Sequence, residues 1–469
     1  MSGDSETNGK LGYSRVRFGQ AFFVWLKISL LSFGGPAGQI AVMHRLLVEE
    51  LKWISEKRFL HALNFCMLLP GPEAQQLTIY LGWLLHRVRG GVVAGVLFVL
   101  PGAVTVLFLS IIYVKYQQSM VVAAVFFGVK AAVLAIVMIA LWRLAQKLIR
   151  KSFLMGIAVG SFIATFVFSI SFPLVIVAAA LVAFVANAKL SFDQKQYPEH
   201  KENSGEKGSD WEDNWRAIDR VVLTQPLALH RPLLLVVLAC ALLWLTPVAV
   251  LYGWFGTSYI YTQQAMFFSQ VAVVTFGGAY AVLSYMAQQT VEQYGWLSAG
   301  EMLDGLGMAE ATPGPLIMVT QFVGFIGAYR SPGMLDPMLA GCLGALVTTW
   351  VTFAPCFLWI FLGAPYIESL RGNRTLAVVF TGITAAVVGV VLNLAIWFGV
   401  RVLFSELVEL PLMIGDITLA LPSLASFNPF ASAITAASLL AIAKFRVGMI
   451  TALAASSAAG LALWSAGLV

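Results

Sequence analysis

The sequence predicts an all-α polytopic membrane protein, in which two inverted-topology repeats bring broken, re-entrant helical hairpins together near the midplane. Three observations predict this class: the composition, an internal duplication, and Pro-Gly-Pro tripeptides inside apolar stretches. Hydrophobic residues make up 59% of the 469 residues and charged residues only 11%, with a mean hydropathy of +0.84. A soluble domain carries about 25% charged residues, so the composition excludes most soluble enzyme classes.

Apolar segments of spanning length occur along most of the chain. They lie near residues 91–114, 121–142, 153–170, 173–189, 232–252, 335–362, 375–400, 428–443 and 447–467. Two regions, about 18–86 and about 262–329, are different, because Gly-Gly and Pro-Gly-Pro divide them into short apolar runs. We expect short helices in these regions, separated by turns at membrane depth.

The predicted domain order follows from these segments. It comprises a cytoplasmic N-terminal segment, a first membrane repeat, a cytoplasmic linker, a connecting transmembrane helix and a second, inverted repeat, at residues 1–17, 18–189, 190–231, 232–252 and 262–469. The linker is polar and mixed in charge, which is typical of a solvated tether. Residues 1–20 lack the apolar core of a cleaved signal, so the first apolar segment is expected to remain in the protein.

The two halves of the chain repeat the same residues in the same order. Three pairs lie 243 residues apart and two further pairs lie 254 apart: Gly34 and Gly277, Trp53 and Trp296, Pro70 and Pro313, then Pro101 and Pro355, Gly128 and Gly382. A long collinear match with one insertion is typical of an internal duplication. We therefore expect the two halves to share one fold.

The distribution of basic residues predicts how the repeats are oriented. Lys and Arg gather before the first half, after its broken region and before residue 152, at Lys10, Arg15, Arg17, Arg87, Arg89, Arg143, Lys147, Arg150 and Lys151. Basic residues favour the cytoplasmic side of a membrane. With these groups and the linker inside, residues 232–252 carry the chain outward, so the second half starts on the opposite side. Inverted repeats of this kind are common among secondary transporters.

The turns are the predicted binding site for a small oxyanion. They are Gly34-Gly35-Pro36 and Pro70-Gly71-Pro72 in the first half, and Gly277-Gly278 and Pro313-Gly314-Pro315 in the second. Proline ends one helix and fits the start of the next, and irregular backbone survives at membrane depth only in protein or beside a wet cavity. Each new helix offers free N–H groups and a partial positive charge. The alternative is that the turns only let helices pack or kink.

Polar side chains near the turns are expected to complete this site. The candidate cations are Lys27, Arg45 and Lys130, and the neutral hydrogen-bonding groups are Gln39, Gln75, Gln76, Thr78 and Thr312. Lys130 has no acid in its own segment and could supply a fixed positive charge. The alternative for the cations is that their side chains reach the membrane interface.

Two carboxyl groups are the predicted proton carriers. Glu73 lies on the first turn of a helix, where the helix dipole favours its ionised form, and Glu310 precedes Pro313 at a helix end, where dipole and burial favour the protonated form. Glu73 is alternatively a plain helix-start acid. An intramembrane enzyme that uses the two as acid and base is a weaker interpretation, because no converging catalytic groups accompany them.

The sequence indicates no metal site, no cofactor and no nucleic-acid surface. The four cysteines, Cys66, Cys240, Cys342 and Cys356, lack the spacing of metal ligands. The formal charge of +6 comes mostly from Lys and Arg between apolar segments. A receptor-type bundle would not explain the duplicated breaks, so transport is the favoured function.

The ordered motifs of the first half resemble the chromate ion transporter (CHR) family. These are Phe33-Gly34-Gly35-Pro36, Trp53-Ile54-Ser55, Leu68-Leu69-Pro70-Gly71-Pro72-Glu73-Ala74-Gln75-Gln76-Leu77, Phe98-Val99-Leu100-Pro101-Gly102 and Phe127-Gly128-Val129-Lys130-Ala131-Ala132-Val133. The resemblance covers both halves, as in a long-chain, two-domain member. Two positions differ from the family pattern: Ala132 replaces a proline, and Gln39 stands where many members have a histidine.

The resemblance implies a function and a location. It implies a protein of the bacterial inner membrane that exports chromate in exchange for protons, with sulfate as a structural analogue of the substrate. The expected partners are therefore chromate or sulfate, protons, the lipid bilayer and a second copy of the chain in a homodimer. A carrier or exchanger of sulfate or another oxyanion is the alternative within transport.

Overall fold

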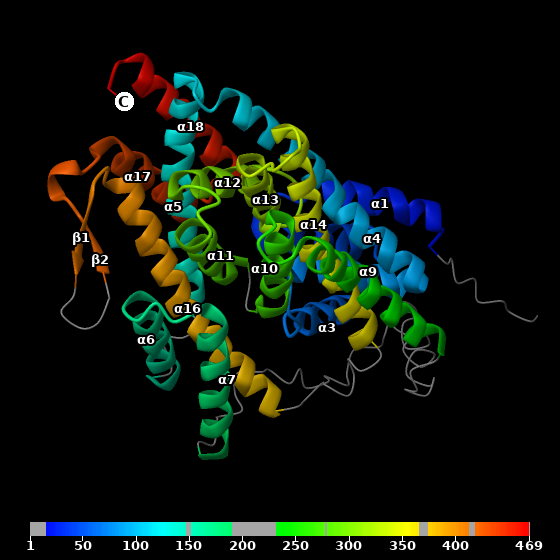
Figure 1. Ribbon diagram of the computed structural model, residues 1–469. Coiled ribbons are helices and arrows are strands. Elements are labelled where there is room, and N and C mark those ends of the chain that lie inside the picture. Colours follow the sequence, from blue (N-terminus) through cyan, green and yellow to red (C-terminus); the bar gives the residue numbers. More distant parts are fainter. Residues whose placement is uncertain are drawn as a thin grey trace, which may run out of the picture.

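The computed structural model describes residues 16–146, 152–189, 231–276, 279–364, 374–411 and 418–468. Nearly all of these residues are helical, and the helices form one interlocked bundle (Figure 1). Within the described part of the chain, five helices are long and apolar enough to cross a membrane by length and composition. They are α4 (Glu73–Tyr116), α5 (Met120–Gln146), α14 (Pro337–Gly363), and residues Leu233–Phe255 and Thr375–Leu403 of α9 (Arg231–Phe255) and α16 (Arg374–Leu403). The predicted class of an all-α polytopic membrane protein is confirmed.

Each half begins with short helices separated by turns. Before α4 the first half contains α1 (Phe18–Leu31), α2 (Gly35–His44), the π-helix η1 (Arg45–Glu50) and α3 (Glu56–Cys66). Before α14 the second half contains α10 (Ile260–Val274), α11 (Ala279–Ala287), the π-helix η3 (Gln288–Gln293), α12 (Ala299–Ala311), the 3-10 turn η4 (Leu316–Met318) and α13 (Val319–Arg330). The predicted breaks at Gly34 and at both Pro-Gly-Pro tripeptides are confirmed, because helices end before and begin after each.

The duplication extends to irregular features of the backbone. The π-helices η1 and η3 start at Arg45 and Gln288, 243 residues apart. Ser55 and Ser298, which share that offset, are the N-caps of α3 and α12, and each hydroxyl accepts a hydrogen bond from the backbone three residues on. π-Helices are rare, so their recurrence at matching positions supports a common fold for both halves.

The later helices of each half pack against the long helix of the other half. The first half ends in α6 (Ser152–Phe166) and α7 (Phe172–Lys189), and the second in α17 (Pro429–Ala443) and α18 (Met449–Ser465). Helix α16 packs against α6 and α7, whereas α5 packs against α17 and α18 (Figure 1). The halves therefore exchange their last helices.

Glycine permits these exchanged contacts. A Cβ atom at Gly128 of α5 would meet the backbone of Ser456 in α18, and one at Gly382 of α16 would meet Ala183 in α7. Small residues let membrane helices approach closely where packing drives association. Gly128 and Gly382 lie 254 residues apart, so the same contact occurs twice.

Two features differ from the sequence-based expectation. Helix α4 runs from Glu73 to Tyr116 and joins the predicted half-helix to the predicted span, with a kink where His86 and Arg87 have non-helical backbone angles. An antiparallel hairpin of β1 (Leu407–Pro411) and β2 (Thr418–Pro422) follows α16, and the 3-10 turn η6 (Leu424–Ser426) leads on to α17. The helix-based pattern gave no signal for this hairpin.

Some predicted features lie outside the described residues. These are the linker, apart from its last residue, most of the N-terminal segment, and Gly277 and Gly278. The domain boundaries and the inverted orientation of the repeats therefore remain predictions.

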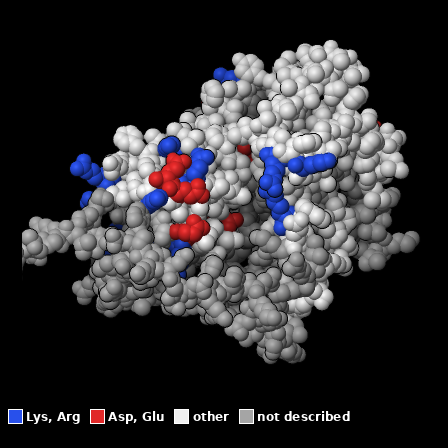
Figure 2. All heavy atoms as spheres, turned by 180° about the vertical axis from the view of Figure 1, so that it is seen from behind, with Lys and Arg blue, Asp and Glu red and all other residues white. Residues whose placement is uncertain are grey.

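The surface is largely uncharged. Figure 2 shows that the Lys, Arg, Asp and Glu side chains on one face gather in a mixed group and a mainly basic group, surrounded by uncharged atoms. Only 6% of the most apolar stretch of α9 is buried within the protein. Large side chains of this helix, such as Leu235, Leu238 and Leu242, are exposed. Broad apolar surface of this kind is rare on soluble monomers and suits contact with lipid.

Candidate functional site

The turns of the two halves bind each other through reciprocal hydrogen bonds. The backbone N–H of Gly314 donates to the carbonyl oxygen of Ser32 at 2.9 Å, and that of Gly71 donates to the carbonyl oxygen of Thr275 at 2.8 Å. Ser32 and Thr275 lie 243 residues apart, as do Gly71 and Gly314. The same bond is thus made twice, once in each direction between the halves.

Glycine is required in these turns by the backbone conformation. Gly34, Gly35, Gly71 and Gly314 have φ angles of 80°, 71°, 122° and 102°. Residues with a Cβ atom rarely adopt such angles. Pro36 occupies the first turn of α2, whereas Pro72 and Pro315 are the N-caps of α4 and η4. The predicted helix starts at the turns are confirmed, although a 3-10 turn intervenes after Pro315.

We call Gly34-Gly35-Pro36 the first turn and Pro70-Gly71-Pro72 the second turn. Two of the predicted glutamines support the turns between the halves. The Gln39 amide donates to the carbonyl oxygen of Gly314 at 2.6 Å, and the Gln76 amide donates to that of Pro70 at 2.6 Å. Thr78 and Thr312 donate to carbonyl oxygens of their own helices, Ala74 and Ala309. Each of these four side chains thus donates one hydrogen bond to a backbone carbonyl, and their part in binding an anion stays a prediction.

Gln75 differs from the other glutamines. Its side chain is fully buried at the start of α4, and neither its amide nitrogen nor its amide oxygen has a hydrogen-bond partner. Burying an amide without a partner is costly. Among the predicted neutral groups, Gln75 is the one whose amide makes no hydrogen bond in the described structure. It lies at the second turn, where half-buried Glu73 begins α4.

Glu310 lies at the first turn, as expected for a carboxyl that serves the binding site. Its side chain is almost completely buried near the end of α12, and the Tyr280 hydroxyl donates to Oε1 at 2.7 Å. Oε2 has no hydrogen-bond partner, and a Cβ atom at Gly35 would lie 3.9 Å from it. Gly35 therefore brings the backbone of the first turn close to this carboxyl. Sequence reasoning missed Tyr280, because a single tyrosine in an apolar run carries no signal.

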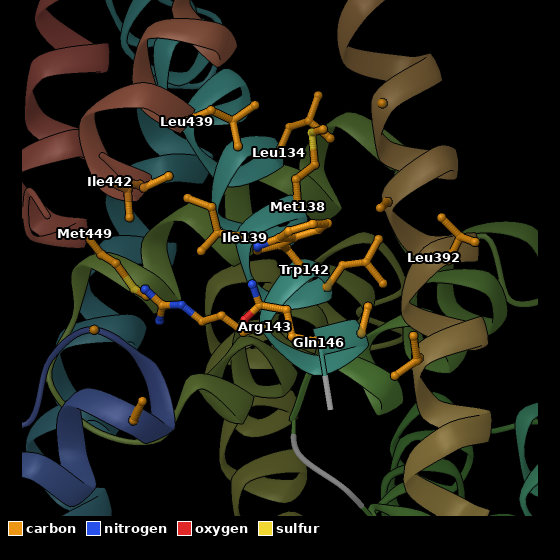
Figure 3. Close-up of a pocket in the computed structure, with 18 of the residues that line it drawn as sticks. Leu134, Met138, Ile139, Trp142, Arg143, Gln146, Leu392, Leu439, Ile442 and Met449 are labelled. Carbon is orange, nitrogen blue, oxygen red and sulfur yellow. The ribbon is translucent and has the colours of Figure 1, made fainter. Parts of the chain in front are cut away.

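A large cavity reaches the first turn from one side. Its volume is about 1480 Å³, and Gly34 and Gly38 form part of its lining together with apolar residues of α5, α6, α16 and α17. The charged residues in the lining are both basic, Arg143 and Arg446. Figure 3 shows the Arg143 side chain extending from α5 toward Met449.

Lys130 is not an unpaired charge, contrary to the expectation from its own segment. Its Nζ atom lies 3.3 Å from Oδ1 of Asp304, a buried residue of α12 in the other half. The Tyr113 hydroxyl donates to Oδ2 of Asp304 at 2.9 Å. Lys130 contributes to a second cavity of about 410 Å³, in which Arg330 is also paired with Glu301 at 2.7 Å.

Lys27 and Arg45 do not contribute to either cavity. Lys27 is exposed on α1 and is absent from both linings. The Arg45 guanidinium lies 3.4 Å from the Glu50 carboxylate, and both side chains are about half exposed. The role of these two residues in anion binding, and the alternative of an interfacial position, both stay predictions.

Helix α12 runs from the second cavity to the turn at Gly34-Gly35-Pro36. Asp304 contributes to the second cavity and Glu310 lies at the first turn, and six residues of α-helix rise about 9 Å. Each carboxyl receives a hydrogen bond from one tyrosine.

Comparisons with known proteins agree with this picture of two repeats. A family model described as "Chromate transporter" matches residues 19–184 and 262–461. A probable chromate transport protein of Synechococcus elongatus is 30% identical over 389 residues, which cover 82% of this chain and 85% of that protein.

Two further relatives are similar over comparable lengths. The chromate transport protein of Pseudomonas aeruginosa is 30% identical over 382 residues, or 80% of each chain, and that of Cupriavidus metallidurans is 28% identical over 396 residues, or 84% of each. No solved structure matches the chain.

Proposed function

Because this chain belongs to the chromate transporter family, we propose that it is a secondary transporter that exports chromate across the bacterial inner membrane in exchange for protons. The observation that carries the proposal is the first turn. There the start of α2, the basic cavity and the carboxyl of Glu310 converge. These groups supply what a tetrahedral dianion and a proton each need.

The proposed path of chromate begins in the large cavity. Arginine binds oxyanions through charge-assisted hydrogen bonds, so Arg143 and Arg446 attract chromate into an otherwise apolar space. The free N–H groups at the start of α2 then receive it at the first turn. Arg143 belongs to a basic group that the positive-inside rule assigns to the cytoplasm, which supports entry from that side.

Glu310 is the proposed proton carrier of the exchange. A buried carboxyl without a cationic partner is more stable in its neutral form when it crosses the membrane. We infer that Glu310 takes up a proton outside after chromate has left and releases it into the cytoplasm. Glu73, at the start of α4, is the second candidate for this role.

Flux measurements in proteoliposomes test the transport proposal and the role of Glu310 together. We expect the wild-type protein to move chromate, and chromate efflux to be faster when the opposite compartment is acidic. Glu310→Gln cannot release a proton, so its chromate flux should no longer depend on the pH gradient. Sulfate and molybdate are measured in parallel, and the exposed Glu406→Gln serves as control.

Each outcome of these measurements has a distinct meaning. Wild-type pH dependence in Glu310→Gln would dismiss Glu310 as the carrier. Flux of sulfate without chromate would keep the transporter and change its substrate. Purified protein that moves none of the three anions would contradict the proposed function.

A second coupling scheme is favoured by one observation. Among the described residues no cation donates a hydrogen bond to Oε2 of Glu310, which lies at the first turn. An anion bound there would favour the neutral form of this carboxyl. Direct electrostatics therefore also supports co-transport of an oxyanion with a proton. Under co-transport, acidifying the compartment that contains the anion would accelerate its flux, which is the reverse of exchange.

The proposed inverted topology is tested by labelling single cysteines from either side of the membrane. We propose that the linker at residues 190–231 is cytoplasmic and that Arg330 faces outward. A cysteine in place of Ser204 should then react with an impermeant thiol reagent only from the cytoplasmic side, and one in place of Arg330 only from outside. Labelling of both from the same side would exclude inverted repeats with these boundaries.

A further inference from the structure

Three groups around the second cavity contribute positive charge. The Lys130 ammonium and the Arg330 guanidinium both line it, and so does the first turn of α12 through Ser298 and Gly300. The N-terminal end of a helix adds a partial positive charge. A Cβ atom at Gly300 would lie 3.4 Å from Nζ of Lys130, so the absence of a side chain lets the ammonium approach the helix start.

The two acids of the cavity are held differently. Glu301 is bound three ways, because its carboxylate accepts from the backbone N–H of Ser298 at 2.8 Å and pairs with Arg330, while its own N–H donates to the Ser298 hydroxyl. Asp304 accepts one hydrogen bond, from Tyr113, and its Oδ1 contacts only the ammonium of Lys130. Asp304 is therefore the acid that an incoming anion would displace more easily.

The Lys130–Asp304 ion pair, in which the carboxylate is buried and the lysine side chain is 31% exposed, gives this displacement a direction. Removing one partner of a buried pair leaves an uncompensated charge, which is strongly unfavourable. An anion that binds Lys130 therefore has to leave Asp304 neutral, and a proton achieves this. The cavity, at about 410 Å³, has room for a tetrahedral oxyanion with several waters.

We propose that the second cavity binds the oxyanion, which takes the place of Asp304 at the Lys130 ammonium while Asp304 accepts a proton from the water of the cavity. The identity of the anion as a tetrahedral dianion rests on the proposed function. Oxyanion and proton bind this cavity together, so the cavity is a second position for the transported ion, and Asp304 is a second proton site in addition to Glu310.

The other charged groups around Asp304 do not replace Lys130 in this role. The titratable and charged residues that line the cavity are Tyr113 from α4, Lys130 from α5, Glu301 from α12 itself and Arg330 from α13. Helices α18 and η4, which also pack against α12, contain no charged residue, and Arg401 of α16 pairs with Glu292 instead.

Proton uptake on anion binding tests the proposal directly. Purified protein in weakly buffered solution near neutral pH is mixed with sulfate or chromate, and both heat and the pH of the solution are recorded. We expect the wild-type protein to take up protons as the anion binds. In Asp304→Asn the anion should still bind, but proton uptake at this cavity should disappear and the affinity should no longer rise as the pH falls.

Two further variants distinguish this role from a merely structural one. Tyr113→Phe removes the hydrogen bond to the ionised carboxylate, so Asp304 becomes neutral at a higher pH and the anion should bind more tightly near neutral pH. Lys130→Met should weaken anion binding about tenfold or more, the size of a lost charge-assisted contact. Arg401→Met removes the cation of a different ion pair and should change neither measurement.

The outcomes separate this inference from the transport proposal. Wild-type protein that binds anions while Lys130→Met binds them equally well, or while Asp304→Asn takes up as many protons, would overturn the second site and leave the first turn as the binding position. Wild-type protein that binds no oxyanion would instead contradict the proposed function. Weaker binding in Tyr113→Phe would also contradict the assigned role of Asp304.

Discussion

Replacing both Arg143 and Arg446 with methionine is expected to lower chromate flux at subsaturating concentration about a hundredfold. These are the two charged residues in the lining of the large cavity. A charge-assisted contact contributes roughly a factor of ten or more, and each single variant should lose about that much. The loss should appear as a higher half-saturating concentration, because the arginines attract the anion and do not reorient the protein. Flux into proteoliposomes at varied chromate concentration measures it.

Matched variants show whether the position or only the charge matters. Arg89→Met removes an exposed cation that the sequence assigns to the same side but that does not line the cavity, so its flux should remain near wild type. Arg143→Lys keeps the charge and should retain part of the activity. Equal losses in Arg89→Met and Arg143→Met would mean that surface charge attracts chromate in general, and the cavity would lose its assigned role.

Gly314→Val is expected to abolish transport and to lower thermal stability by several degrees. Its φ angle of 102° is unfavourable for a β-branched residue, and a Cβ atom at Gly314 would lie 3.4 Å from Cα of Gly102 and 3.5 Å from the carbonyl oxygen of Phe98. Backbone strain at such a position costs about 1–3 kcal/mol. The added methyl groups would also weaken the hydrogen bond from the Gly314 N–H to the carbonyl oxygen of Ser32. Thermal unfolding and chromate flux are measured on the same preparation.

Gly333→Val is the control for backbone strain. Gly333 also has a positive φ, 62°, but no atom lies within 4 Å of a Cβ placed there. This variant should therefore lose some stability through strain while it keeps its transport activity. If Gly314→Val behaved like Gly333→Val in both measurements, the hydrogen bonds between the turns would not be needed for transport.

The breaks in the helices could be predicted from the sequence because their causes are local. Proline and glycine act through the backbone at their own positions, so Pro70, Gly71 and Gly314 mark turns whatever surrounds them. The duplication was equally visible, since an offset of 243 residues is a property of the chain alone. The hairpin of β1 and β2 was not predicted, because it is short and lacks a distinct pattern in an apolar chain.

The partners of polar side chains could not be read from the sequence. Lys130 and Asp304 lie 174 residues apart, with the end of the first repeat, the whole linker and the connecting helix between them, and nothing local links them. Gln39 was a candidate anion donor because of its place after the first turn, yet its amide is bound to Gly314 of the other half. Arg143 was predicted only as an indicator of the cytoplasmic side, although it lines the cavity that reaches the first turn.

The sequence by itself determined the membrane class, the repeated order of residues in the two halves, and the breaks at Gly34 and at both Pro-Gly-Pro tripeptides, because composition, periodicity and backbone preference act over short distances. Only the tertiary structure decided which carboxyl faces which cation and which turns meet. Those choices depend on how the halves exchange their last helices and interlock, and close packing of this kind joins residues that are hundreds of positions apart.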